Sequence, residues 1–77
     1  SMDVPLSQLF QLVGIPSDDS DKYEAVFLEN DITADMLPDI TYDILKQLNI
    51  KLGHQMKMMK LAQSRSKKAV KKQKVEE

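Results

Sequence analysis

Residues 40–57 read ITYDILKQLNIKLGHQMK, and this stretch contains one short helix followed by the start of a long one. Thr41 is a residue type that caps helix N-termini, and it precedes apolar side chains that fall on one side of a helix, namely Ile44, Leu45 and Leu48. After Gly53 neither glycine nor proline occurs again, so nothing interrupts a helix that begins at Leu52. The stretch therefore predicts a capped short helix, a tight connection and a long final helix.

The first predicted helix lies near the N-terminus. Pro5 suits a first helical turn and Gly14 suits a helix end. Between them, apolar residues recur at helical spacing, namely Leu6, Leu9, Phe10 and Val13. This pattern predicts a short helix with one buried face.

Two further helical segments are predicted before residue 40. A polar turn over residues 16–19 leads to Ser20, which is expected to cap a segment that carries Tyr23, Val26 and Phe27. That segment should end near Asn30, because asparagine tolerates the left-handed conformation found at helix ends. Thr33 then offers a cap for a short turn, which carries Met36 and Leu37 and is closed by Pro38.

The final helix should bury a stripe made by Leu52, Met56 and Met59, which lie at positions i, i+4 and i+7. Met58 and Ala62 widen this stripe, and the three methionines are all predicted to be core residues. The domain proper is expected to span residues 4–64. Residues 65–77 are predicted to form a basic C-terminal helical extension or a disordered tail, and residues 1–3 are interpreted as a cloning remnant and leader.

The composition allows one small all-α domain. The chain has 77 residues, of which 42% are hydrophobic and 30% charged, which is typical of globular proteins. It contains no cysteine, so disulfides and thiolate metal sites are excluded. No apolar run reaches the roughly 18 residues that a membrane span requires. We expect an intracellular protein, because a small domain without disulfides suits a reducing compartment. We further expect the cytoplasm rather than the nucleus.

Charge is divided along the chain. Residues 1–45 contain ten acidic residues and one lysine, a net charge of −9, whereas residues 46–77 contain ten basic and two acidic residues, a net charge of +8. The overall charge of −1 therefore conceals a strong dipole. If the chain folds into one body with opposite charges on separate faces, two bodies can associate through unlike faces. The other interpretation is that both charge sets simply lie on solvated helix faces.

The ordered combination of several short motifs resembles the sterile alpha motif (SAM) domain. The resemblance covers about Val4 to Gln63, and its motifs are Leu12-Val13-Gly14-Ile15, then Tyr23-x-x-x-Phe27-x-x-Asn30-x-Ile32, then Leu37, then Ile40-Thr41-x-x-Ile44-Leu45-x-x-Leu48-Asn49-Ile50-x-x-Gly53-His54-Gln55-x-Lys57. The resemblance implies a small five-helix bundle with a long C-terminal helix. This agrees with the number of helices predicted from the residues alone.

The chain departs from the usual SAM pattern at a few positions. Phe10 replaces a frequent tryptophan, Asn49 replaces the glycine of Leu-Gly-Ile, and Met58-Met59 replaces an aliphatic pair. Gln55 stands where an arginine commonly follows Gly-His. A charge-driven contact at the start of the last helix must therefore rely on neighbouring lysines.

The family resemblance implies a non-catalytic module that binds itself or another SAM domain head to tail. The end-helix surface, at the start of the last helix, matches Lys51, Leu52, Gly53, His54 and Lys57. The mid-loop surface of the next copy matches Glu29, Asp31, Asp35, Asp39 and Asp43. The two sets have opposite charges, and the free N–H groups of a helix start attract carboxylates. Leu52 is expected to be an apolar anchor of this contact or else a core residue.

Nucleic-acid binding through the last helix and tail is the main alternative. Residues 65–74 contain six basic side chains that suit phosphate contacts, and some SAM domains bind RNA hairpins. The tail has no aromatic residue, however, and the first helix has no lysine or arginine, so a base-reading surface is not predicted. A lipid-surface role for the same lysines lacks the apolar flank that it requires.

Catalysis and cofactor binding are not predicted. The single histidine, His54, has no cysteine or evident nucleophile near it in the sequence. The acidic run Asp18-Asp19-Ser20-Asp21 fails as a calcium loop, because Tyr23 falls where the loop requires glycine. We expect no metal, no cofactor and no small-molecule substrate, and we interpret the acidic run as a turn and helix N-terminus.

Overall fold

The computed structural model describes residues 4–75, and the side chains of residues 4–66. Its elements are helices α1 (Leu6–Leu12), α2 (Ser17–Glu29), the 3-10 helix η1 (Ala34–Asp39), α3 (Tyr42–Gln47) and α4 (Leu52–Val75). No strand occurs in the described range. The predicted all-α bundle of five helices with the longest one last is therefore confirmed, whereas the interpretation of residues 1–3 lies outside the described residues.

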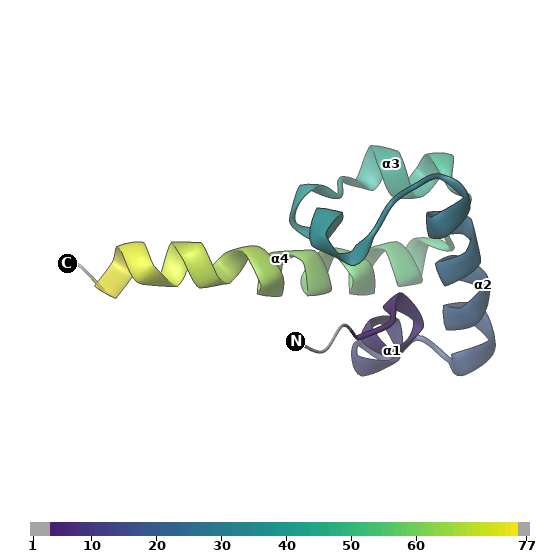
Figure 1. Ribbon diagram of the computed structural model, residues 1–77, viewed down its shortest axis with the longest axis horizontal. Helices are drawn as coiled ribbons and strands as arrows, with labels where there is room; N and C mark the ends of the chain where they lie inside the picture. Colours follow the sequence, from purple (N-terminus) through teal and green to yellow (C-terminus); the bar gives the residue numbers. More distant parts are fainter. Residues whose placement is uncertain (1–3, 76–77) are drawn as a thin grey trace.

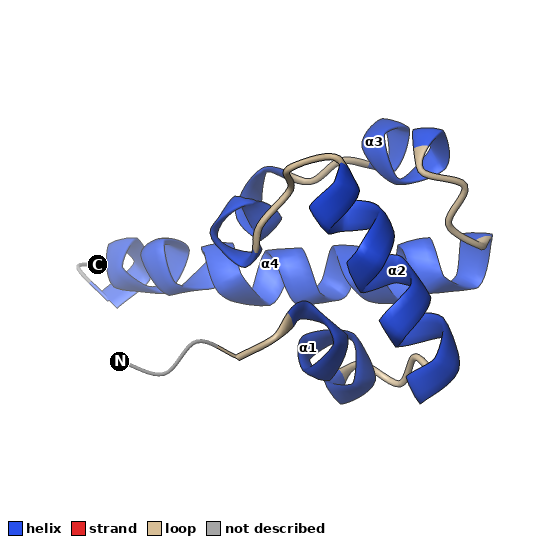
Figure 2. Ribbon diagram, turned by 45° about the vertical axis from the view of Figure 1, so that its right-hand side comes forward, coloured by secondary structure: helices blue, strands red, loops and turns tan. Residues whose placement is uncertain are grey.

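Helix α4 is the axis around which the other elements are arranged (Figure 1). It packs against η1 and α3 on one side and against α1 on the other, while α1 also packs against α2. Figures 1 and 2 both show the last part of α4 projecting beyond the other helices. This projecting part contains most of the basic residues of the chain.

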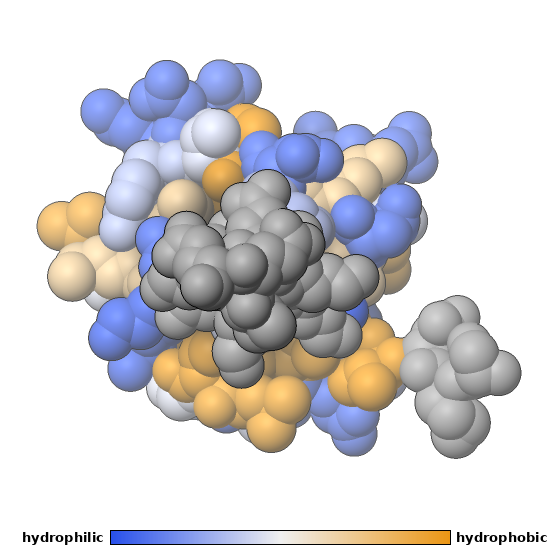
Figure 3. All heavy atoms as spheres, turned by 90° about the vertical axis from the view of Figure 1, so that its left-hand side faces the viewer, coloured by the Kyte–Doolittle hydropathy of each residue, from blue (hydrophilic) through white to orange (hydrophobic). Residues whose placement is uncertain are grey.

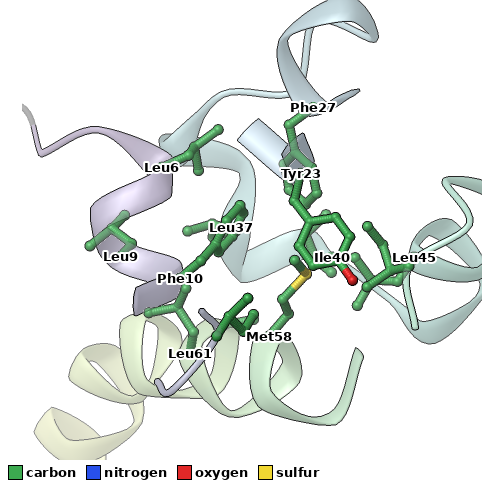
Figure 4. Packing of buried hydrophobic residues seen from close by; sticks show 13 residues of the cluster. Leu6, Leu9, Phe10, Tyr23, Phe27, Leu37, Ile40, Leu45, Met58 and Leu61 are labelled. Carbon is green, nitrogen blue, oxygen red and sulfur yellow. The ribbon is translucent and has the colours of Figure 1, made fainter. Parts of the chain in front are cut away.

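The core is centred on the two phenylalanines (Figure 4). Phe10 and Phe27 are both fully buried, and their rings meet edge to face with centroids 5.2 Å apart. Tyr23 contacts Phe10 in the same manner, at 6.5 Å. Aliphatic side chains from α1 and from the later elements complete the cluster, chiefly Leu6, Leu9, Leu37, Ile40, Leu45, Met58 and Leu61. Phe10 therefore anchors α1 in the core.

Three helices end in the same backbone motif. Gly14, Asp31 and Asn49 have positive φ values of 93°, 57° and 62°, and each follows the end of a helix. After each of them, an isoleucine N–H donates to a carbonyl five residues earlier, in the pairs Ile15–Phe10, Ile32–Phe27 and Ile50–Leu45. This is the Schellman motif, in which the isoleucine also contacts the helix it closes. Helix α2 does end near Asn30, as predicted, but the left-handed residue is Asp31, one position later.

The start of α2 also differs from the prediction. The helix begins at Ser17 after Pro16, so residues 17–19 belong to its first turn rather than to a preceding loop. Ser20 is fully buried within the helix, and its hydroxyl donates to the carbonyl oxygen of Ile15 at 3.1 Å. The prediction that Ser20 caps α2 was therefore wrong, and its hydroxyl instead forms a buried hydrogen bond that joins the α1–α2 connection to α2. The acidic side chains of Asp18 and Asp19 do lie at the helix start, where they suit the dipole.

The buried face of α4 is rotated from the predicted stripe. Met58 is fully buried, and Leu61 and Ala62 are nearly so, but Leu52 and Met56 are 69% and 54% exposed. The prediction that Met56 is a core residue was therefore wrong. The periodicity was misleading because α4 carries two overlapping sets of apolar residues, one containing Leu52 and Met56 and the other containing Met58, Leu61 and Ala62. Only contact with α1, α3 and η1 determines which set is buried.

Candidate protein interface

The five predicted mid-loop residues are all exposed and lie on three consecutive elements. Glu29 is the last residue of α2, Asp31 follows it, Asp35 and Asp39 belong to η1, and Asp43 lies in the first turn of α3. Figure 2 shows the end of α2, η1 and the start of α3 towards its upper part, with the start of α4 at its right-hand end. The acidic residues thus surround the connections between α2 and α3.

A small apolar hollow opens among these elements. Its volume is about 220 Å³, and it is lined by Ile32, Met36, Ile40 and Ile44, with Asp39 as the charged member of the lining. Met36 is 42% exposed, and Ile32 and Ile44 are half-buried, so apolar surface faces solvent here. The hollow is large enough to hold an aliphatic side chain, and the Asp39 carboxylate lies beside it. We call it the mid-loop hollow.

The first residues of α4 present both charge and apolar surface. Lys51 and Leu52 are exposed, and Leu52 shows more of its surface than Met36 or Met56. Gly53 lies inside the helix and does not have a positive φ, and a Cβ built on it would meet nothing within 4 Å. Neither the local turn nor packing within the chain therefore requires a glycine at position 53. Its effect is to leave the backbone of the helix start uncovered.

His54 is held against the core by an aromatic contact. It is half-buried, its Nδ1 atom lies 2.6 Å from the hydroxyl oxygen of Tyr23, and the two rings meet edge to face at 5.5 Å. Gln55, in the next position, is buried and donates to the carbonyl oxygen of Ile50 at 2.8 Å. These two bonds fix the first turn of α4 on the domain. They also show that Gln55 has a structural role.

Lys57 is less available than the sequence suggested. It is half-buried, and its Nζ atom would lie 3.1 Å from a Cβ at Gly14, at the end of α1. A cation suits this position, because the C-terminal end of a helix is its negative end. Of the five predicted end-helix residues, the structure therefore brings Lys51, Leu52 and Gly53 to the surface and ties His54 and Lys57 to other elements.

Sequence reasoning did not find the mid-loop hollow. Its lining comes from the connection after α2, from η1 and from α3, and each residue was predicted only as part of a local pattern or not at all. A usable signal was the alternation of apolar residues with the predicted acidic ones between positions 31 and 44. That alternation places aliphatic and charged side chains within the same short connections.

Comparison with known proteins identifies the family. Among the described helices, none is both long enough and apolar enough to cross a membrane. Searches of curated proteins and of solved structures gave no match. The family model of the SAM domain, or sterile alpha motif, matches residues 15–65, which is more than half of the chain and extends from the end of the α1–α2 connection into α4. This chain therefore belongs to the sterile alpha motif family, whose domains are small helical bundles that generally act as protein-interaction modules.

Proposed function

We propose that this domain associates head to tail with a second copy or with another SAM domain. The acidic mid-loop surface of one domain receives the basic end-helix surface of the next, with Lys51 facing the carboxylates. The observation that carries the proposal is the pairing of an exposed aliphatic side chain, Leu52, with an aliphatic hollow that adjoins Asp39. The charges orient the two surfaces, and the apolar pair supplies the centre.

The energetics favour a weak contact. Exposed ion pairs each contribute only about 0–1 kcal/mol. Burial of Leu52, which is 69% exposed, adds roughly 1–2 kcal/mol of the 1.5–3 kcal/mol that a fully buried leucine provides. Association also costs several kcal/mol in lost translational and rotational freedom. The domain should therefore associate measurably at low ionic strength and dissociate as salt screens the charges.

Two charge reversals test the two surfaces separately. Asp39→Lys alters the rim of the mid-loop hollow, and Lys51→Glu alters the end-helix surface. Lys51 is a better target than Lys57, because Lys57 also contacts the α1 end and its reversal risks unfolding. Each variant alone should be monomeric in sedimentation experiments at low salt. An equimolar mixture should form a dimer through the one intact surface that each variant retains.

Matched controls separate surface position from net charge. Asp18→Lys changes the net charge as Asp39→Lys does, but Asp18 lies in the first turn of α2, at the opposite end of that helix from the mid-loop residues. Arg65→Glu is the equivalent control for Lys51, about 20 Å further along α4 at 1.5 Å per residue. Both controls should associate like the parent chain. If the parent is monomeric at low salt and binds no SAM domain, or if Asp39→Lys and Lys51→Glu both associate normally, the proposal is wrong.

A further inference from the structure

Two exposed methionines lie on the two surfaces that the proposed head-to-tail contact brings together. Met56 is 54% exposed on α4, four residues after Leu52, so the two side chains lie on the same side of the helix about one turn apart. Met36 is 42% exposed on η1 and lines the mid-loop hollow together with Asp39. Neither methionine belongs to the core cluster or to the half-buried residues packed against it.

Exposure alone does not mark an interface, because apolar surface also faces solvent elsewhere. Figure 3 views the molecule from the end towards which α4 projects, and it shows apolar patches among hydrophilic ones there. Val4 and Leu28 are 44% and 52% exposed, although neither belongs to the mid-loop or end-helix surface. The spacing of the two methionines along their helices is a more specific observation.

Each methionine lies at a similar distance from a charged residue of the proposed contact. Met56 follows Lys51 by five residues, which is about 7.5 Å at the α-helical rise. Met36 precedes Asp39 by three residues, which is about 6 Å at the rise of a 3-10 helix. Residues three apart in a 3-10 helix lie on the same side, in agreement with the shared lining of the hollow. The charge therefore comes before the methionine along α4 and after it along η1.

We propose that the head-to-tail partner is a second copy of this chain, in which Met56 of one copy packs on Met36 of the other, with α4 and η1 antiparallel across the contact. The inference rests on the proposed function, because it takes the pairing of Lys51 with Asp39 as given. Opposite chain directions then bring Met56 to Met36, about one 3-10 helical spacing from Asp39. Parallel directions would carry Met56 towards Asp43 in the first turn of α3, where it would cover a carboxylate.

The methionine pair favours self-association over binding to an unrelated SAM domain. Unbranched thioether side chains adapt their shape to each other, so the two methionines can pack closely without exact complementarity. Both come from the same sequence, and a partner with a charged residue in place of Met36 would leave Met56 against a polar group.

Engineered cysteines test the pair directly, because the chain contains no cysteine of its own. One sample carries Lys51→Glu with Met36→Cys and keeps the mid-loop surface. The other carries Asp39→Lys with Met56→Cys and keeps the end-helix surface. Mild oxidation of the mixture should give a disulfide-linked dimer on a non-reducing gel, since a disulfide requires Cα atoms within about 7 Å. Gln63→Cys in place of Met56→Cys is the matched control and should give no linked dimer in the same time, because Gln63 is exposed on the same side of α4 but lies about 10 Å further along.

The affinity of the mixed dimer gives a second measurement. Met56→Ser in the Asp39→Lys sample should raise the Kd about fivefold, because roughly half of a methionine side chain is no longer buried in the contact. Gln63→Ser in the same sample should leave the Kd unchanged. Because Met56 is exposed in the isolated domain, its substitution leaves the core intact.

The outcomes separate this inference from the proposed function. If Met56→Cys links faster to Asp43→Cys than to Met36→Cys, or if Met56→Ser leaves the Kd unchanged, the methionine pair is wrong although head-to-tail association stands. If the two charge variants without cysteines form no dimer when mixed, self-association fails and the methionine pair fails with it.

Discussion

Replacing Gly53 by alanine should stabilise the fold and weaken association at the same time. A methyl group at position 53 meets nothing within 4 Å in the isolated domain, so it causes no internal clash. Alanine is favoured over glycine within a helix by about 0.5–1 kcal/mol, because glycine loses more backbone freedom on folding. Gly53 is only the second residue of α4, so we take the lower value, about 0.5 kcal/mol. In a domain of this size that gain corresponds to a rise in Tm of about 2–4 °C.

The effect on association has the opposite sign. If a partner approaches the uncovered backbone at the start of α4, a methyl group there is overpacked, which typically costs about 1–3 kcal/mol. The dissociation constant should then rise by about fivefold or more. Thermal unfolding measures the first effect and sedimentation at low salt measures the second. Because the two effects differ in sign, loss of folded protein cannot imitate the expected result.

The other glycine of the chain is the natural control. Gly14 has a φ of 93°, and a Cβ there would lie 3.1 Å from the Lys57 ammonium, so Gly14→Ala should lower stability by about 1 kcal/mol or more. If Gly53→Ala destabilises the domain, the helix start differs from the one described. If it stabilises the domain and leaves association unchanged, the partner does not approach this backbone.

Further substitutions test the packing of the domain. Met58→Ala should lower the free energy of unfolding, measured with urea, by about 2–5 kcal/mol, because Met58 is fully buried. Met56→Ala, two residues away, should change it by about 0.5 kcal/mol or less. Equal losses would contradict the assignment of the buried face of α4. Tyr23→Phe removes the hydroxyl that bonds to His54 and should cost about 0.5–1.5 kcal/mol in the same assay, with no loss if that bond is absent in solution. Asn49→Gly should raise Tm slightly and Asn49→Ala should lower it, because position 49 has a φ of 62°; the reverse order would exclude a left-handed residue there.

Local patterns in the sequence predicted the number, order and class of the helices. Capping and helix-ending residues have effects within a few positions, so Thr41 and Gly14 marked real helix boundaries. The Thr41 hydroxyl accepts from the Ile44 N–H at 3.2 Å, as expected of a cap. Ser20 misled because a serine hydroxyl bonds equally well to a carbonyl across a buried turn, and only the fold determines which partner it meets.

The candidate interface was less accessible from the sequence. The family resemblance together with charge selected the five acidic residues, and each of them is exposed. The sequence did not reveal that the Lys57 side chain lies against the end of α1, or that four apolar residues form a hollow beside Asp39. Both features depend on contacts between segments that are distant in the sequence. The exposure of Leu52 likewise depends on which face of α4 is buried, and the apolar periodicity of α4 did not determine that face.

The repeated helix-ending motif has a consequence for how such domains diversify. Three helix ends are fixed by backbone hydrogen bonds and by isoleucines that pack in or against the core, so polar residues other than the left-handed ones contribute little to the architecture. Surface charges on these short connections can then be exchanged during evolution without rebuilding the interior. A scaffold closed in this way can be redirected to new partners by a few substitutions, each of which leaves folding almost untouched.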